Sequence, residues 1–117
     1  MRSKDALGKF GEELAAAHLE RLGMVLLDRN WRCEVGELDL VARHDDDLVI
    51  CEVKTRRTSN FGDPAEAIST RKLKKLRECA YLWLVEKRVH PSAIRFDVVA
   101  IVQPWEGAPI LRHIKGV

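Results

Sequence analysis

The stretch "GELDLVARHDDDLVICEVKT", residues 36–55, decides the fold. Apolar and polar residues alternate on both sides of the acidic run "HDDD" at 44–47, which predicts two antiparallel strands joined by a tight turn. A two-residue turn and a four-residue turn at this point give the same strand register. The sequence therefore predicts a hairpin whose cross-strand partners can be named.

In this register Asp39 lies opposite Glu52, and Glu37 lies opposite Lys54. Side chains alternate between the faces of a strand, so these four polar groups share one face. The opposite face is expected to be apolar and to press on a core, with Leu38, Leu40, Ala42, Val49, Cys51 and Val53. The hairpin is thus expected to be anchored on one face and chemically active on the other.

The predicted opposition of Asp39 and Glu52 requires compensation. Directly opposed residues have Cβ atoms only ~4.5–5.5 Å apart, so two carboxylates there repel one another. A divalent cation between them removes the repulsion, and Mg²⁺ combines one or two carboxylates with water and phosphate oxygens. Lys54, two residues beyond Glu52, would reach the attacking water or the charge that develops on phosphorus. This pattern is typical of a phosphodiesterase site.

A plainer interpretation explains the same alternation. Glu37 and Lys54 would form an ordinary cross-strand ion pair, with Asp39 and Glu52 solvated on an exposed sheet face. A three-residue loop in place of the tight turn would also shift the register and separate Asp39 from Glu52.

The rest of the chain supplies two helices and three more strands. The expected elements are a helix over 5–22 ended by Gly23, a strand over 24–32, the hairpin strands, a loop over 58–64, a second helix from 69 or 70 to 87, and strands over 95–102 and 109–117 around a turn at 104–109. The helical spacing predicts a buried face of Leu7, Phe10, Leu14, Ala17 and Leu22 in the first helix, and of Leu73, Leu76, Ala80, Trp83 and Leu84 in the second.

Length and composition favour a single domain over residues 1–117, of which 46% are hydrophobic. The apolar runs fall far short of the ~20 residues that cross a bilayer, and the charged start is unlike a signal peptide, so we expect a cytoplasmic protein without a membrane partner. The 3 cysteines lack metal-site spacing and are interpreted as buried or idle thiols.

Positive charge is concentrated rather than abundant. The net charge is only +2, but "TRKLKKLR" at 70–77 holds five cations and no acid, close to Arg56 and Arg57. Cations at a helix N-terminus oppose the macrodipole, and a passing phosphate backbone would reverse that cost. The residues predicted to contact a nucleic-acid backbone are Arg56, Arg57, Arg71, Lys72 and Lys75, for each of which a solvated charged face is the alternative. Trp83 is expected in the core, and Trp31 is the better candidate for stacking on a base.

Several ordered blocks of the chain carry a family resemblance. They are Gly11-Glu12, "RNWR" (29–32), "GELDLVA" (36–42), "EVKTR" (52–56), "FGDPAEAI" (61–68), "RFDVV" (95–99) and "HI" (113–114). Asp39 followed by Glu52-Val53-Lys54 resembles the site of the PD-(D/E)xK nuclease superfamily. The whole set resembles the bacterial YraN-like family, whose members are similar to Holliday-junction resolvases.

The resemblance implies a restriction-endonuclease-like α/β fold, with a mixed sheet flanked by helices in the order α-β-β-β-α-β-β. It implies that Asp39, Glu52 and Glu12 hold Mg²⁺ or Mn²⁺ and that Lys54 assists the water, with the Val53 carbonyl as a further ligand. Glu37 has no assigned role. The implied activity is endonucleolytic hydrolysis of DNA, branched or junction DNA included, and symmetric cutting of a junction would favour a homodimer.

Two other classes of function remain open from the sequence. One is a non-catalytic nucleic-acid-binding accessory protein that keeps the nuclease scaffold, and the other is a structural or interaction domain with surface ion pairs. Metal-dependent cleavage separates the nuclease from the accessory protein, and salt-sensitive nucleic-acid binding separates the accessory protein from the structural domain.

Overall fold

A computed structural model of the chain describes residues 3–58 and 68–117. Its elements are α1 (Ser3–Arg21), β1 (Val25–Arg32), β2 (Glu37–His44), β3 (Asp47–Arg56), α2 (Thr70–Lys87), β4 (Ala93–Val102) and β5 (Ile110–Ile114). The predicted α/β class and the order α-β-β-β-α-β-β are confirmed. Apart from Thr58, the loop predicted over 58–64 lies outside the described residues.

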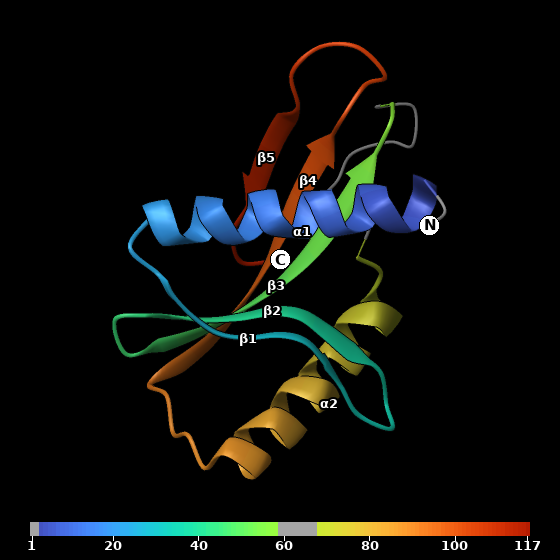
Figure 1. The fold of residues 1–117 in the computed structure, drawn as a ribbon. Helices are drawn as coiled ribbons and strands as arrows, with labels where there is room; N and C mark the ends of the chain where they lie inside the picture. The colour runs from blue at the N-terminus through green and yellow to red at the C-terminus, as the bar shows by residue number, and fades with distance from the viewer. Residues whose placement is uncertain (1–2, 59–67) are drawn as a thin grey trace.

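The strands form a mixed five-stranded sheet in the order β1-β2-β3-β4-β5 (Figure 1). β3 and β4 pair in parallel, whereas the other neighbours are antiparallel. A parallel pair needs a long crossover connection, and α2 lies in the connection between β3 and β4. The sheet therefore has its one parallel pair near its centre, and one member of that pair, β3, is the strand that carries Glu52 and Lys54.

Both faces of the central strands are buried, because each helix covers one of them. Leu40, Ala42, Val49 and Cys51 share a core cluster with Ala15, Ala16 and Leu19 of α1. Val41, Leu48 and Ile50 share a second cluster with Leu76, Cys79, Ala80 and Trp83 of α2. The expected division into one apolar and one polar face was therefore wrong for most of the hairpin. Leu38 was also expected in the same layer as Leu40, but it belongs to the α2 cluster.

The buried face of α1 differs from the predicted one. Phe10 and Leu22 are each 40% exposed, and the side that meets the sheet is made of alanines and Leu19, with the predicted Leu14 partly buried against them. A Cβ atom on Gly11 would overlap the Thr55 side chain of β3, so this helix lies directly on the strand. Periodicity of large residues misses such a face, because close approach requires small ones.

The second helix follows its prediction closely. Ser69 is its N-cap and accepts a 3.1 Å hydrogen bond from the backbone N–H of Lys72. Leu76, Ala80 and Trp83 are buried as expected, with Cys79 added to the face. Neither α1 nor α2, the helices of the described ranges, combines the length and hydrophobicity that a membrane span needs.

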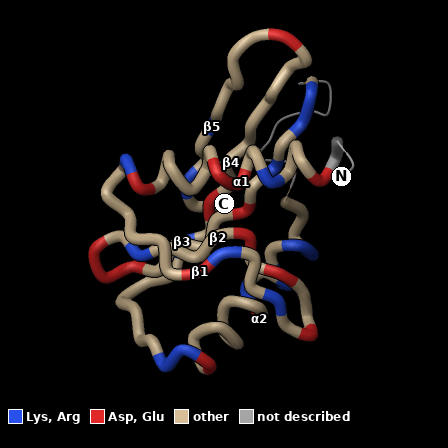
Figure 2. Tube along the Cα trace, in the orientation of Figure 1, with Lys and Arg blue, Asp and Glu red and all other residues tan. Residues whose placement is uncertain are grey.

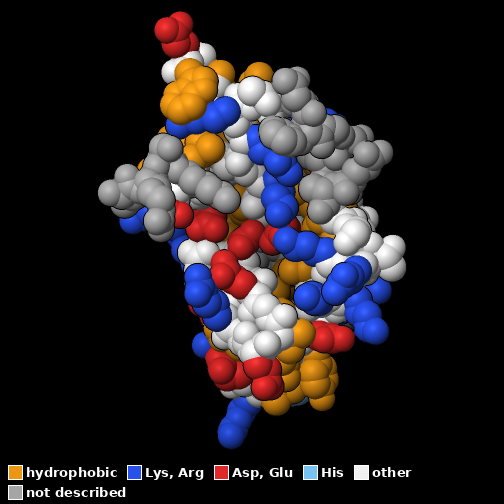
Figure 3. Space-filling model, turned by 90° about the vertical axis from the view of Figure 1, so that its right-hand side faces the viewer, with side chains coloured by type: hydrophobic (Ala, Val, Ile, Leu, Met, Phe, Trp, Pro, Cys, Tyr) orange, Lys and Arg blue, Asp and Glu red, His pale blue; other side chains and the backbone are white. Residues whose placement is uncertain are grey.

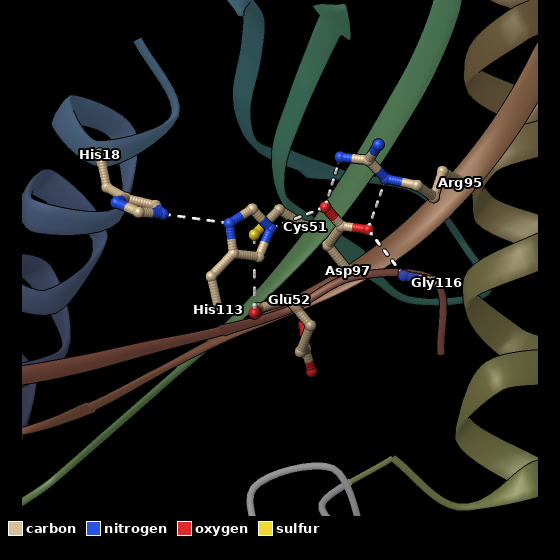
Figure 4. A network of polar contacts seen from close by, with 7 residues as sticks. All are labelled: His18, Cys51, Glu52, Arg95, Asp97, His113 and Gly116. Atoms are coloured by element: carbon tan, nitrogen blue, oxygen red, sulfur yellow. Dashed lines mark hydrogen bonds and ion pairs between the residues drawn. The ribbon is translucent and has the colours of Figure 1, made fainter. Parts of the chain in front are cut away.

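A buried carboxylate, Asp97 of β4, ties the C-terminal strand to α1 (Figure 4). It accepts two hydrogen bonds from Arg95, at 2.9 and 2.8 Å, and one of 3.1 Å from the Gly116 backbone. His113 contacts it through Nε2 at 2.7 Å, and the Nδ1 atom of His113 meets Nε2 of His18 at 3.0 Å. This network holds the end of β5 to the α1 side of the sheet.

Candidate functional site

The site begins where the predicted hairpin register stops being a regular ladder. The turn places Asp45 at a φ of 56°, and the paired residues of β2 and β3 run from His44↔Asp47 to Leu40↔Cys51, in the predicted register. At the next residue, Asp39, a side-chain hydrogen bond takes the place of backbone pairing. Oδ2 of Asp39 accepts a 2.9 Å hydrogen bond from the backbone N–H of Val53. The carboxyl of Asp39 is thereby fixed beside the strand that carries Glu52.

A cleft of about 450 Å³ opens at this point, between the sheet, α1 and α2. Its lining includes all four residues expected to carry catalysis, namely Glu12, Asp39, Glu52 and Lys54. Two of the predicted nucleic-acid contacts, Lys72 and Lys75 of α2, line it as well. Figure 3 faces this region and shows acidic side chains at the centre with Lys and Arg side chains above and beside them. Residues from three parts of the sequence thus converge on one concave surface.

Three carboxylates form a compact group in the cleft. Glu12, Glu37 and Asp39 can each place one oxygen within 4.8 Å of the others, with α1 supplying the first and β2 the other two. Glu12 reaches this group because the neighbouring Gly11 lets α1 lie on Thr55. The donor set consists of oxygen ligands alone, which suits a hard cation such as Mg²⁺ or Mn²⁺.

Glu37 does not pair with Lys54, as the plainer interpretation of the hairpin required. It forms an ion pair with Arg32, its neighbour on β1, at 3.0 Å. The ladder between β2 and β3 has already opened at this level, so Lys54 no longer lies across from it. Glu37, left without a role by the sequence, is instead part of the acidic group.

Glu52 is the most buried acid of the cleft, with 5% of its surface exposed. Its Oε2 contacts Nζ of Lys72 at 2.5 Å and Nζ of Lys54 at 3.6 Å. Lys72 was expected to contact a phosphate backbone; in the structure it pairs with an acid inside the cleft, and its contact with nucleic acid stays a prediction. Lys54 lies in the same arrangement, on the same face of β3 as Glu52.

The charges of this cluster shift one another's pKa values. Burial, followed by the adjoining carboxyl of Glu52, raises the pKa of Asp39 to about 8. Burial also opposes ionisation of Glu52, but its hydrogen bonding with Asp39 and Lys72 and the charges of both lysines hold its pKa below the usual value. Burial, with Lys72 nearby, lowers the pKa of Lys54. At neutral pH and without a cation, Asp39 therefore keeps its proton while Glu52 is ionised.

The remaining predicted basic contacts lie outside the cleft. Arg56 ends β3, Arg57 follows it, and Arg71 is exposed in the first turn of α2. Figure 2 shows Lys and Arg at the end of β3 and in the first turns of α2. Arg57 donates a 3.3 Å hydrogen bond to the Gln103 carbonyl and its guanidinium lies 4.0 Å from the centre of the Trp105 ring. The cations thus continue from the cleft along the end of β3.

The tryptophans and cysteines are arranged partly as expected. Trp83 is buried and donates a 3.0 Å hydrogen bond to Asp28, which confirms its place in the core. Trp31, the preferred stacking candidate, packs against the same cluster and donates to Glu86. All 3 cysteines are free thiols, and the sulfurs of Cys33 and Cys79 lie 3.5 Å apart.

Several groups in the site and its surroundings had no role predicted from the sequence. Glu37 was detectable, because its spacing of two from Asp39 places both side chains on one face of β2. No sequence pattern indicated the ion pair of Glu52 with Lys72. The two residues lie on different elements, β3 and α2, and the packing of one against the other sets their contact. Trp105 lies in a stretch interpreted only as a turn, and its 77% exposure became visible only in the structure.

Comparison with known proteins places the chain in a family. Residues 11–101 match the family model described as "Uncharacterised protein family UPF0102". The chain is 53% identical over 116 residues to a UPF0102 protein of Frankia alni, covering 99% of this chain and 97% of that protein. It is 50% identical to UPF0102 proteins of Acidothermus cellulolyticus and of a Nocardioides species, each covering 97% of this chain and 94% and 92% of the respective relative. The resemblance to the YraN-like family is confirmed at this level, and the chain belongs to the UPF0102 family.

Proposed function

We propose that this protein is an endonuclease that hydrolyses phosphodiester bonds in DNA with the help of Mg²⁺ or Mn²⁺. The observation that carries the proposal is the meeting of Glu12, Glu37 and Asp39 with Glu52 and Lys54 in one cleft. The resemblance of Asp39 and the Glu52-Val53-Lys54 run to the PD-(D/E)xK pattern points in the same direction.

The donor set fits a divalent cation. Glu12, Glu37 and Asp39 would hold it, with Glu52 as a further candidate, since its carboxyl adjoins Asp39. The raised pKa of Asp39 is the cost of gathering these acids without a counter-charge. A bound Mg²⁺ or Mn²⁺ would supply that charge and would activate a water for attack on phosphorus.

The protein's own side chains have separate tasks around the scissile phosphate. Lys54 faces the acids from β3 and would stabilise the negative charge that develops on the phosphoryl oxygens. The lowered pKa of Lys54 also favours transfer of a proton from its ammonium group. Lys72 holds Glu52 in place through its ion pair, so it acts as a positioning residue.

Substrate binding would come from cations around the cleft. Lys75 lines it, and Arg56, Arg57 and Arg71 lie beyond its edge. Contacts of this kind are made to phosphates, so they fix the position of the strand without reading its sequence. The predicted homodimer for junction cutting stays a prediction.

The test is cleavage of a labelled panel containing a four-way junction, a flap, duplex DNA, single-stranded DNA and RNA, with Mg²⁺, Mn²⁺ or EDTA. Lys54→Ala is compared with Lys74→Ala, which removes an exposed lysine of α2 that does not line the cleft. We expect metal-dependent products from the wild type and from Lys74→Ala, and a loss of at least ~10²-fold in Lys54→Ala, as for removal of one transition-state donor. Equal activity of the two variants would contradict the proposal.

One observation favours the accessory-protein alternative. Glu52, expected as a metal ligand, is already neutralised by Lys72 and Lys54, as in a site that only binds. In that case every substrate of the panel would stay intact with each metal, while DNA binding would still weaken steeply with salt.

A further inference from the structure

The loop between β4 and β5 exposes an aromatic ring beside Arg56 and Arg57, the cations that continue from the cleft along the end of β3. Of the 3 tryptophans of the chain, Trp105 is the exposed one, at 77%. An exposed indole on a structured loop offers a large, rigid aromatic surface, and tryptophan is enriched at interfaces for this reason. The Arg57 guanidinium lies over one side of the ring, 4.0 Å from its centre, so the ring is held in place by a cation–π contact.

The loop that carries this ring is ordered by Gln103. Its backbone N–H donates a 2.8 Å hydrogen bond to the Arg56 carbonyl, and its own carbonyl accepts from Arg57 at 3.3 Å. Its side-chain amide donates to the carbonyls of Pro104 and Gly107, at 3.1 and 3.2 Å. Gly107 has a φ of 103°, which only glycine adopts at low cost. Trp105 is therefore presented on a preformed turn tied to the end of β3.

The position of the ring relative to the cleft follows from the strand. Lys54 lines the cleft and Arg57 comes three residues later, a distance of ~10 Å at the rise of a β-strand. About three stacked nucleotides span that length at ~3.4 Å each. Figure 3 shows hydrophobic side-chain atoms next to Lys and Arg atoms at the upper end of this face, above the acidic centre.

We infer that Trp105, held by Arg57, is a stacking platform for an unpaired nucleobase two or three nucleotides from the phosphate in the cleft. The inference rests on the proposed function, and it specifies the substrate class as nucleic acid with unpaired nucleotides beside the cut, such as a flap, an overhang or an opened junction. A ring with a cation on one side and the other side open accepts any base, because every base has a π face. Bases inside a continuous duplex are stacked on each other and cannot use it.

The test is binding measured in EDTA, so that no cleavage occurs, by fluorescence anisotropy of labelled single-stranded DNA, an overhang duplex and a blunt duplex. Trp105→Phe keeps an aromatic face, and Trp105→Leu keeps apolar bulk without one. We expect Trp105→Leu to lose about tenfold in affinity for the single strand and the overhang. Its affinity for the blunt duplex should fall less than twofold, and Trp105→Phe should stay within about threefold of the wild type throughout. Unchanged thermal midpoints would verify that both variants are folded.

A second measurement uses the tryptophan itself. Single-stranded DNA should quench part of the tryptophan fluorescence of the wild type. Trp105→Phe should lack that part of the emission, and single-stranded DNA should not quench what remains. Equal losses on all three DNAs, or none, with wild-type binding intact, would overturn the platform and leave the nuclease proposal standing. Preservation of single-strand affinity by Trp105→Leu would indicate a general apolar contact and would overturn it too. Absence of salt-dependent DNA binding by the wild type would overturn both proposals.

Discussion

Two carboxylates on the strands that flank β3, Asp39 on β2 and Asp97 on β4, have opposite surroundings. Asp97, on the α1 side, is 1% exposed and receives hydrogen bonds from Arg95 and Gly116 together with the contact from His113. Asp39, in the cleft, receives one from the Val53 backbone and lies among acids, with Lys54 and Lys72 also nearby. Burial opposes ionisation in both cases, yet the pKa of Asp97 is lowered and that of Asp39 is raised.

The difference distinguishes an acid whose charge is balanced within the fold from one that we propose to be functional. The partners of Asp97 balance its charge inside the fold, so the network needs nothing from solution. The acids around Asp39 raise its pKa even though Glu37 pairs with Arg32 and Glu52 with both lysines, so a proton or an added cation would stabilise this group. Perturbed pKa values concentrate at functional sites, and the raised pKa of Asp39 supports the proposal that the cleft is the site.

Helix α1 connects the two regions. Its Gly11-Glu12 segment reaches the cleft, and its His18, two turns later, meets His113 at 3.0 Å. Small residues on the buried face let it lie close enough to the sheet to serve both.

The largest expected effect comes from breaking the balanced region. Asp97→Ala leaves Arg95 and His113 without their acid, and loss of one partner from a buried ion pair costs about 3–5 kcal/mol. Urea unfolding at pH 7 measures the change. A loss below about 1 kcal/mol would mean that the network contributes little to the fold.

A smaller loss is expected where α1 crosses β3. Gly11→Ala places a Cβ atom in the Thr55 side chain, and overpacking of this kind costs about 1–3 kcal/mol. Gly8→Ala is the matched control, since the space beside Gly8 is open, and it should stabilise the helix by about 0.5–1 kcal/mol. Thermal unfolding of both variants provides the comparison, and changes of the same sign would contradict the close contact.

In the cleft, we expect removal of the Asp39 charge to increase the free energy of unfolding. Asp39→Asn keeps an acceptor for Val53 and removes a repelled charge, so the metal-free protein should gain about 1–2 kcal/mol at pH 8. The folded wild type holds the proton of Asp39 up to about pH 8, whereas the unfolded chain releases it near pH 4. The wild-type free energy of unfolding should therefore decrease as the pH rises from about 4 through about 8. Denaturant unfolding in EDTA across that range should show the slope in the wild type and a flatter curve in Asp39→Asn. A destabilised Asp39→Asn would break the comparison.

The weakest effect concerns His18. Burial, with the charges of His113, Arg21 and Lys115, lowers its pKa, so the unfolded chain takes up the proton more readily. Stability should therefore fall as pH decreases through about 6.5, and His18→Phe should reduce that slope. An unchanged slope between pH 7 and 5 would exclude His18 as its source.

Much of the fold was predictable because it depends on local signals. The acidic turn fixed the hairpin register, and Ser69 marked the start of α2 as a capping residue should. The buried face of α1 was not predictable from large apolar residues, because its packing relies on Gly11 and the alanines.

The sequence predicted which residues line the candidate site, but not which of their side chains contact one another. Asp39, Glu52 and Lys54 came together because strand alternation and register bring them there. The opening of the ladder at Asp39, the link from Lys72 to Glu52 and the ring of Trp105 depend on long-range packing, for which short sequence patterns carry no signal.

The central claim is that the cleft acids form a cation site, and titration calorimetry of Mn²⁺ at pH 7 tests it most directly. Two buffers with different ionisation enthalpies should be compared, because Asp39 must release its proton when the ion binds. We predict one Mn²⁺ per chain with proton release, affinity at least ~10-fold weaker in Asp39→Asn, and no change in Glu34→Gln, an exposed acid outside the cleft. Absence of Mn²⁺ binding by the wild type, or equal binding by Asp39→Asn, would contradict the account.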